Sequence, residues 1–214
     1  MQLNYWDASW PLRVDICPCD VHFIEYLQAA GVQDKVIFHF GTGAHHILGK
    51  TNLEAAVPNE ILAITASREE HDSYVEFIIA NPLAAKTYKV LFGDIYTLTP
   101  RIVPNFDFVT LFHLCEFYEE GSFQYAGLDD AGLLDLFLTK LNRGGRVFFY
   151  TGSSHFAKCR LIIDRFVDQA RMVPVDEYKT LLVYGRADER GSADAEASRL
   201  APCPARRQGL DGAQ

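Results

Sequence analysis

Hydrophobic residues along this chain gather in short runs, and each run is followed by small or polar residues that favour turns. A run that is nearly all hydrophobic is typical of a strand covered on both faces, as in a parallel sheet. The runs therefore predict strands over Val36–Phe40, Glu60–Thr65, Tyr88–Phe92, Phe106–Phe112, Arg146–Tyr150 and Tyr178–Tyr184.

Between these runs, hydrophobic residues recur three and four positions apart, which is the period of one face of a helix. Strands that alternate with helices indicate an α/β fold with a doubly wound, mostly parallel sheet and helices on both faces. The predicted helices cover Val21–Ala30, Ser67–Ala80, Gly132–Leu141 and Ser154–Arg171, and a short one begins near Ala44.

Polar residues at the predicted boundaries support these assignments. Asp20 is expected to cap the first helix. Ser67 and Glu70 match the capping-box pattern, in which each side chain accepts a hydrogen bond from a free backbone N–H. A turn is expected at Asn142–Gly145 before the fifth strand, and another around Pro174 before the last strand.

Composition divides the chain into three parts. Residues 1–20 include Trp6 and Trp10 and are predicted to form an irregular arm or a lid. Residues 187–214 contain almost no large hydrophobic side chain and are predicted to be a disordered tail. Residues 21–186 lie between them, and a chain of 214 residues is long enough for one well-packed domain.

The formal net charge is −8 and the isoelectric point is about 5.3. This acidic balance argues against a nucleic-acid phosphate track and against an anionic membrane surface. No hydrophobic run reaches the roughly 18 residues of a membrane span, and the N-terminus lacks the pattern of a signal peptide. The five cysteines do not make the dense framework of a secreted protein, so we expect reduced thiols and a cytoplasmic location.

One short segment, Cys17-Pro-Cys19-Asp20-Val-His22, places metal-capable side chains close together in the sequence. Zinc sites usually take four ligands from two separated pairs. No second pair accompanies Cys17 and Cys19, because the other three cysteines are scattered along the chain. The sequence therefore favours free cysteines and no metal, with a metal site as the alternative.

The stretch Lys35–Lys50 combines a buried strand, the glycine turn Gly41-Thr42-Gly43 and a helix start. Glycine lets the backbone approach a ligand closely, and the first turn of a helix presents free N–H groups. Doubly wound sheets bind ligands at the carboxyl ends of their strands, near the point where the strand order reverses. This turn is therefore the expected ligand site.

Five stretches in this order resemble the motifs of class I S-adenosylmethionine (SAM)-dependent methyltransferases. Each motif is short, and their order and spacing together carry the resemblance, which covers roughly Val21–Arg186. It implies a Rossmann-like methyltransferase fold over that range, with SAM as the cofactor. The five stretches are Val36–Gly43, Leu62–Ser67, Phe92–Ile95, Phe106–Glu116 and Leu141–Phe149.

The resemblance also implies which residues contact the cofactor. His39 and Thr65 stand where the family has acids, and His45 stands where it has a glycine. The residues alone leave open a buried core histidine at position 39, and a turn or helix-cap role for Asp94. The implied contacts are His39, Gly41, Thr42, Gly43, Thr65, Asp94 and Ile95.

Thr65 is expected to weaken cofactor binding. Each hydrogen bond from a ribose hydroxyl to a carboxylate contributes about 1.5–3 kcal/mol, and a threonine hydroxyl recovers only part of that. The expected loss of affinity is about tenfold or more, unless Ser67 or Glu69 compensates.

Candidate catalytic residues follow the fourth strand. His113 is well placed to act as a general base, and Glu116 follows it, with a structural role as the alternative. Aromatic residues in segments 1–20 and 113–125 favour a small organic acceptor. We therefore expect a small-molecule substrate and neither nucleic acid nor membrane as a partner, while a homo-oligomer or a protein partner remains open.

These features predict a SAM-dependent methyltransferase that acts on a small organic molecule. The alternative is a catalytically inactive methyltransferase-like domain that binds a partner protein, a hypothesis motivated by His39, His45 and Thr65. A nicotinamide-dependent reductase is a third hypothesis. The chain lacks a clear Gly-x-Gly-x-x-Gly motif, a Tyr-x-x-x-Lys pair and an acid after the second strand, all of which such an enzyme would use.

Overall fold

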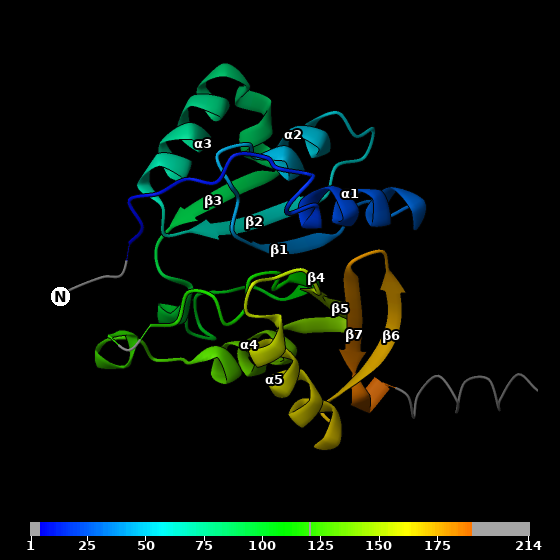
Figure 1. Ribbon diagram of the computed structural model, residues 1–214. Coiled ribbons are helices and arrows are strands. Elements are labelled where there is room, and N and C mark those ends of the chain that lie inside the picture. Colours follow the sequence, from blue (N-terminus) through cyan, green and yellow to red (C-terminus); the bar gives the residue numbers. More distant parts are fainter. Residues whose placement is uncertain (1–4, 120, 190–214) are drawn as a thin grey trace, which may run out of the picture.

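A seven-stranded sheet organises the chain, as Figure 1 shows for the computed structural model, which describes residues 5–119 and 121–189. Its strand order is β3-β2-β1-β4-β5-β7-β6. Strands β1 to β5 pair in parallel, and β7 runs antiparallel to both β5 and β6. The strands are β1 (Val36–Phe40), β2 (Glu60–Thr65), β3 (Tyr88–Phe92), β4 (Phe106–Thr110), β5 (Leu141–Tyr150), β6 (Met172–Tyr178) and β7 (Leu181–Arg186).

Helices cover both faces of this sheet. In Figure 1, α1, α2 and α3 lie on one side of the strands, and α4 and α5 lie on the other. This arrangement confirms the predicted α/β fold with a doubly wound, mostly parallel sheet. The helices are α1 (Cys19–Ala29), α2 (Ile47–Leu53), α3 (Arg68–Ala80), α4 (Asp130–Thr139) and α5 (Phe156–Asp168), with short 3-10 turns η1 (Pro82–Lys86), η2 (Ile95–Thr97), η3 (Ser122–Gln124) and η4 (Ala187–Glu189).

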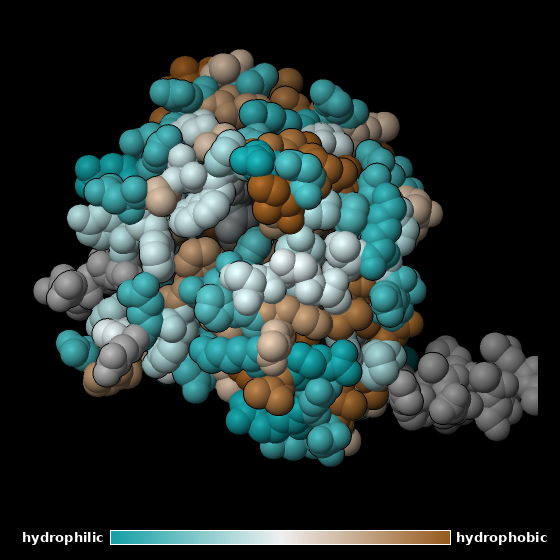
Figure 2. Space-filling view, in the orientation of Figure 1, coloured by the Kyte–Doolittle hydropathy of each residue, from teal (hydrophilic) through white to brown (hydrophobic). Residues whose placement is uncertain are grey.

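Each face of the sheet has its own hydrophobic core. On the α4–α5 side, the ring of Phe38 packs against Phe106 and Phe137, with centroids 5.4 and 4.2 Å apart. On the α1 side, Phe23 packs against Phe148 at 5.0 Å. Burying one such side chain contributes about 1.5–3 kcal/mol. Figure 2 shows hydrophilic side chains over the outer surfaces of α1 and α5, as expected for helices with one buried face.

Two helix starts differ from the sequence prediction. Helix α1 begins at Cys19, and Pro18 stands at the capping position, so Asp20 lies inside the first turn and caps nothing. The Ser67 hydroxyl accepts the Glu70 N–H as predicted, at 3.3 Å. The second half of the capping box is wrong, because the Glu70 carboxylate accepts the Thr65 hydroxyl, 2.7 Å away. In both cases a predicted capping residue instead directs its carboxylate into the candidate site described below.

Three strand predictions also need correction. Strand β4 ends at Thr110, two residues early, which leaves Leu111 and Phe112 in the loop beyond it, together with His113. The expected turn at Asn142–Gly145 lies within β5, where the pairing with β4 shifts register and the extra residues bulge out. The single last strand is a hairpin of β6 and β7, and Pro174 lies inside β6, an edge strand that tolerates a missing N–H.

Two further observations bear on the ends and on membranes. The predicted tail at 187–214 lies outside the described residues, apart from the η4 turn that begins it. Over 5–119 and 121–189, no helix combines the length and the hydrophobicity needed to cross a bilayer.

Candidate functional site

A cleft of about 390 Å³ opens at the carboxyl ends of the parallel strands. Its walls include Gly41 after β1, Thr65 at the end of β2, Asp94 after β3 and His113 after β4. Strand β1 lies between β2 and β4, so the chain reverses its direction of progress through the sheet beside β1. This is where doubly wound sheets bind ligands, and the cleft has the volume of a small-molecule site.

The glycine turn shapes one wall of this cleft. Gly41 and Gly43 both have positive φ, 80° and 52°, which side chains other than glycine rarely adopt. A Cβ atom on Gly41 would meet no atom within 4 Å, so that residue faces open space. A Cβ atom on Gly43 would lie 2.8 Å from the Trp10 carbonyl oxygen and closer still to the His45 ring. Gly43 therefore lets the N-terminal arm cross the turn, and Gly41 leaves room for a ligand.

A buried carboxylate lies beside Thr65 at the end of β2. Glu70, on the first turn of α3, is 2% exposed and accepts the Thr65 hydroxyl at 2.7 Å. It also accepts hydrogen bonds from the Thr42 hydroxyl at 3.4 Å and the Trp10 N–H at 3.3 Å. Burial raises its pKa, and these donors oppose the rise. Glu70 thus places a carboxylate at the end of β2. The resembled family has its ribose-binding acid on that strand, at the position of Thr65.

Asp94 both lines the cleft and caps a turn. One carboxylate oxygen accepts the Tyr96 N–H at 2.9 Å at the start of η2, and the other accepts the Tyr125 hydroxyl at 2.6 Å. The cap role left open by the sequence is therefore present. It holds the carboxylate at the edge of the cleft, next to Ile95.

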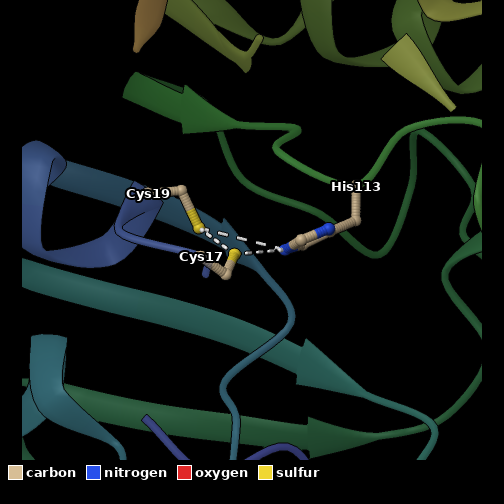
Figure 3. Close-up of side chains that lie close together, drawn as sticks. All are labelled: Cys17, Cys19 and His113. Carbon is tan, nitrogen blue, oxygen red and sulfur yellow. Dashed lines mark hydrogen bonds between the residues drawn. The ribbon is translucent and has the colours of Figure 1, made fainter. Parts of the chain in front are cut away.

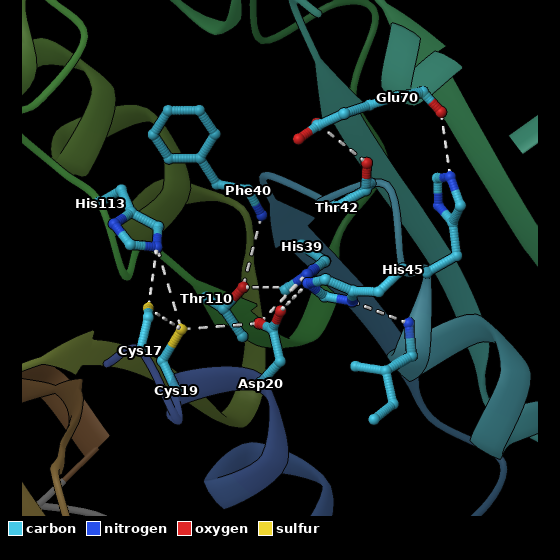
Figure 4. A network of polar contacts seen from close by, with 12 residues as sticks. Cys17, Cys19, Asp20, His39, Phe40, Thr42, His45, Glu70, Thr110 and His113 are labelled. Atoms are coloured by element: carbon cyan, nitrogen blue, oxygen red, sulfur yellow. Dashed lines mark hydrogen bonds and ion pairs between the residues drawn. The ribbon is translucent and has the colours of Figure 1, made fainter. Parts of the chain in front are cut away.

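A second polar network lies behind the glycine turn (Figure 4). The Asp20 carboxylate lies between two imidazoles, 3.6 Å from His39 Nε2 and 3.5 Å from His45 Nε2. His39 Nδ1 also hydrogen-bonds the Thr110 hydroxyl at 2.8 Å. Burial lowers the pKa of His39 to about 3 and raises that of Asp20 to about 7, so His39 is neutral at physiological pH.

The candidate catalytic pair is in direct contact. His113 Nδ1 lies 3.1 Å from Glu116 Oε1, and the Ser153 hydroxyl donates to the same oxygen. Burial opposes a charge on either group. Hydrogen bonds with Cys17 and Glu116 nevertheless raise the pKa of His113 to about 10, and His113 lowers that of Glu116 to about 2. A protonated imidazole cannot accept a proton, so in this state His113 is an ion-pair partner, and its role as a general base stays a prediction.

The other partners of His113 are two cysteines from the segment that begins α1. Its Nε2 atom lies 3.9 Å from both Cys17 Sγ and Cys19 Sγ, and the two sulfur atoms are 3.4 Å apart (Figure 3). The Cys19 thiol lowers the pKa of Cys17 to about 4, burial opposes this, and His113 adds to the lowering. The sequence search for a second cysteine pair missed this grouping, because the third side chain is a histidine 94 residues beyond Cys19.

The N-terminal segment, residues 5–18, contributes several side chains to the lining of the cleft. The Trp6 N–H donates to the Ala66 carbonyl at 2.9 Å, and the Trp10 carbonyl accepts the Ala44 N–H at 3.0 Å. The rings of Trp6 and Trp10 pack edge-on against Phe117, with centroids 5.4 and 5.8 Å apart. Residues 5–18 contain no helix and no strand beyond an isolated bridge between Trp6 and Ser67, and the arm or lid over residues 1–20 stays a prediction.

The structure thus gathers most of the predicted site residues around one cleft. Two of them, His39 and Thr42, are buried and do not line the cleft. Sequence reasoning missed Glu70 as a cleft residue, although its place five residues after the end of a buried strand was a usable signal. The predicted residues that line the cleft are Gly41, Gly43, Thr65, Asp94, Ile95, His113 and Glu116.

Solved structures with a similar fold include methyltransferases, all at low sequence identity. Magnesium protoporphyrin IX methyltransferase from Synechocystis PCC 6803, crystallised with bound SAM, has a TM-score of 0.56 and 10% identity over 79% of this chain and 78% of its own. TrmN from Thermus thermophilus has a TM-score of 0.53 and 17% identity over 78% of this chain. This chain covers 48% of TrmN, about half of its length.

An rRNA methylase from Streptococcus thermophilus is also similar, with a TM-score of 0.50 and 12% identity over 78% of this chain and 96% of its own. No protein-family model matches the sequence, and no curated protein matches it. The similarity in three dimensions, together with the observed sheet order and cleft, establishes the architecture: the chain has the Rossmann-like fold of class I SAM-dependent methyltransferases.

Proposed function

We propose that the protein is a SAM-dependent methyltransferase that transfers a methyl group to a small organic molecule. One observation carries the proposal: a single cleft contains both sets of predicted residues. Gly41, Thr65 and Asp94 lie at the ends of β1, β2 and β3, and His113 and Glu116 face the same space from the loop after β4.

The wall of the cleft suits SAM in shape and charge. Gly41 leaves open space where any side chain would project. The carboxylates of Glu70, Asp94 and Glu116 line the cleft and would attract a positively charged ligand. When bound, SAM supplies a methyl group already activated on a sulfonium, so the chain needs mainly to align the acceptor and exclude water. The protonated state of His113 fits this division of work, because alignment needs no strong base.

The cleft favours a small organic acceptor. Trp6, Trp10 and Phe117 form an aromatic wall, which offers apolar and stacking contacts to a planar molecule. The net charge of −8 disfavours a phosphate backbone. The fold itself does not discriminate, because an rRNA methylase shares it. Charge and cleft size support the small-molecule substrate.

Calorimetry with SAM and S-adenosylhomocysteine tests the proposal. Wild-type protein should bind both, and Gly41→Leu should abolish binding because its side chain would occupy the open space. Gly144→Leu is the matched control: Gly144 also has a positive φ, 77°, with open space around its Cβ position, but it lies outside the cleft. Absence of heat and of a thermal shift with wild type at millimolar ligand would refute the proposal.

That negative result would favour a catalytically inactive partner-binding domain. One observation supports this second function. The Thr65 hydroxyl already donates a hydrogen bond to Glu70, so two groups that would bind the ribose of a cofactor are bonded to each other. Binding of SAM would count against it. A gel-shift measurement with total RNA would then separate a small-molecule enzyme, which should not bind, from an RNA methylase.

A further inference from the structure

Two thiols and one imidazole converge at the edge of the cleft. Cys17 and Cys19 come from the segment that begins α1, and His113 comes from the loop after β4 (Figure 3). Their ligand atoms lie within 4.8 Å of one another, and all three residues line the cleft. The fold has therefore brought together side chains that are distant in sequence, in a place that a ligand can reach.

The spacing of the three atoms matches the coordination shell of one small metal ion. A tetrahedral zinc ion holds sulfur at about 2.3 Å and nitrogen at about 2.0–2.1 Å, which places two sulfurs about 3.8 Å apart and sulfur and nitrogen about 3.6 Å apart. The observed distances are 3.4 Å for the sulfur pair and 3.9 Å for each sulfur to Nε2. A shift of a few tenths of an ångström would complete the shell.

The imidazole is already oriented for this task. Glu116 Oε1 lies 3.1 Å from His113 Nδ1, and the Ser153 hydroxyl donates to the same carboxylate oxygen. When a metal ion displaces the proton on Nε2, this carboxylate keeps the remaining proton on Nδ1, and the lone pair of Nε2 is directed at the two sulfurs. Histidines that bind metals usually have such a carboxylate behind them, which fixes the tautomer and the ring.

A simple cysteine–histidine nucleophile explains the geometry less well. Such a dyad needs one thiol within reach of the ring, whereas here both thiols lie at the same distance of 3.9 Å from Nε2. That distance is long for a hydrogen bond that activates a thiol, and a shared ion accounts for it. The two thiols belong to a Cys-x-Cys segment, so they move together with the start of α1.

We propose that Cys17, Cys19 and His113 bind a zinc ion, with a fourth coordination position open to the cleft. Three protein ligands and one exchangeable position are typical of catalytic zinc sites, whereas structural sites use four protein ligands. The fourth position takes water and exchanges it for a thiol. If the methyltransferase function is correct, and this consequence rests on it, the acceptor is a thiol that loses its proton to solvent on binding to zinc.

Metal analysis of the full-length protein tests the site without any cofactor. Protein purified without chelator, with its affinity tag removed, should carry stoichiometric zinc after dialysis. Cys17→Ala, Cys19→Ala and His113→Gln should each lose it. Glu116→Gln should keep the ligands but weaken zinc affinity about 10–100-fold, because it removes only the group behind the imidazole.

Two matched variants control for general effects. Cys159→Ala removes a buried thiol of the α5 core, and His71→Gln removes an imidazole of α3, and neither residue lines the cleft. Both should keep full zinc. Should a ligand variant fail to fold, the wild-type protein loaded with Co²⁺ still decides: it should show the near-ultraviolet thiolate charge-transfer band and the visible bands of tetrahedral cobalt.

The open position has its own readout. Adding 2-mercaptoethanol to the cobalt protein should change the visible spectrum and strengthen the thiolate band, and a fully protein-ligated site would not respond. Wild-type protein without zinc and without a cobalt–thiolate band would overturn the proposal, as would equal zinc loss in Cys159→Ala. Calorimetric binding of SAM is measured separately, so failure of the zinc site and failure of the methyltransferase function are distinguishable.

Discussion

At the scale of single residues, the cleft contains a carboxylate that comes from a helix, whereas the resembled family has its acid at the end of the second strand. Glu70 lies on α3, yet its oxygen is 2.7 Å from the Thr65 hydroxyl at the end of β2. In the proposed cofactor site, a hydroxyl and a carboxylate from the next element would together replace one acid at the strand end. This replacement is testable by moving the acid back to the strand.

The variant Thr65→Asp should gain little affinity for S-adenosylhomocysteine. Its carboxylate would lie against that of Glu70, and two buried carboxylates this close share a proton. Adding Glu70→Gln removes the conflict, and the double variant should bind about tenfold more tightly than wild type. Calorimetry on both variants and on Glu70→Gln alone checks this. Equal gain in the single Thr65→Asp variant would contradict it.

His46 gives a prediction for pH. Its ring is buried, Nε2 lies 3.0 Å from the Glu70 carbonyl oxygen and Nδ1 lies 3.0 Å from the Tyr88 hydroxyl. Burial lowers its pKa from 6.5 to about 4. The folded state therefore resists a proton that the unfolded state accepts, so stability is lost as pH falls from about 6.5 towards 4, by about 3 kcal/mol.

Urea denaturation at several pH values measures this loss in wild type and in His46→Asn. Asparagine tolerates the positive φ of 47° at this position and does not titrate. The variant should be less stable at pH 7 because it loses two hydrogen bonds, but its stability should fall less between pH 6.5 and 4. Parallel curves for the two proteins would show that His46 does not drive the acid sensitivity.

At residue scale, the sequence predicted which residues line the cleft at the strand ends. It did not predict which side chains from distant segments contact one another there. Gly41 and Asp94 could be found because a turn after a buried strand has a fixed place in a parallel sheet. The grouping of Cys17 and Cys19 with His113 could not, because it depends on which loops the strand order brings together. Local spacing carries no information about such contacts between distant segments.

At the scale of elements, the turn between β1 and α2 constrains its two glycines to different degrees. Gly43→Ala should destabilise the fold by about 2 kcal/mol or more, because a Cβ atom there would approach the Trp10 carbonyl oxygen to 2.8 Å at a positive φ. Gly41→Ala should cost only about 1 kcal/mol, since its Cβ would meet open space. Thermal denaturation compares them, and an equal loss in both variants would mean that the backbone angle alone matters.

The sequence located β1 and β2 correctly, because strands buried on both faces are continuous hydrophobic runs. It also located the edge strand β3, whose run is hydrophobic although part of it is exposed. It missed β6, where the run Met172–Tyr178 mixes Pro174, acids and apolar residues. An edge strand is half solvated, so its composition need not be hydrophobic. The residues Asn142–Gly145 were predicted to be a turn, and they form a bulge inside β5. Gly144 has a positive φ there, which is a backbone angle common in turns and rare within strands.

At the scale of the whole molecule, the N-terminal segment joins the two halves of the site. Trp6 and Trp10 pack on Phe117 beyond β4, while their backbones bond to Ala66 beyond β2 and to Ala44 beyond β1. The same segment continues into Cys17 and Cys19. A ligand that fills the cleft would therefore contact a segment that spans three strand ends, and its binding should hold that segment in place.

The rate of trypsin cleavage within the N-terminal segment measures whether a ligand holds it in place. Arg13 is exposed in the N-terminal segment and lines the cleft, whereas Arg101 is exposed in the loop before β4 and lies outside the cleft. Saturating S-adenosylhomocysteine should slow cleavage after Arg13 several-fold, because cleavage requires the segment to leave the strand ends. Cleavage after Arg101 is the internal control and should keep its rate. Equal protection of both sites would indicate general stabilisation, and no protection at Arg13 would mean that the segment moves independently of the ligand.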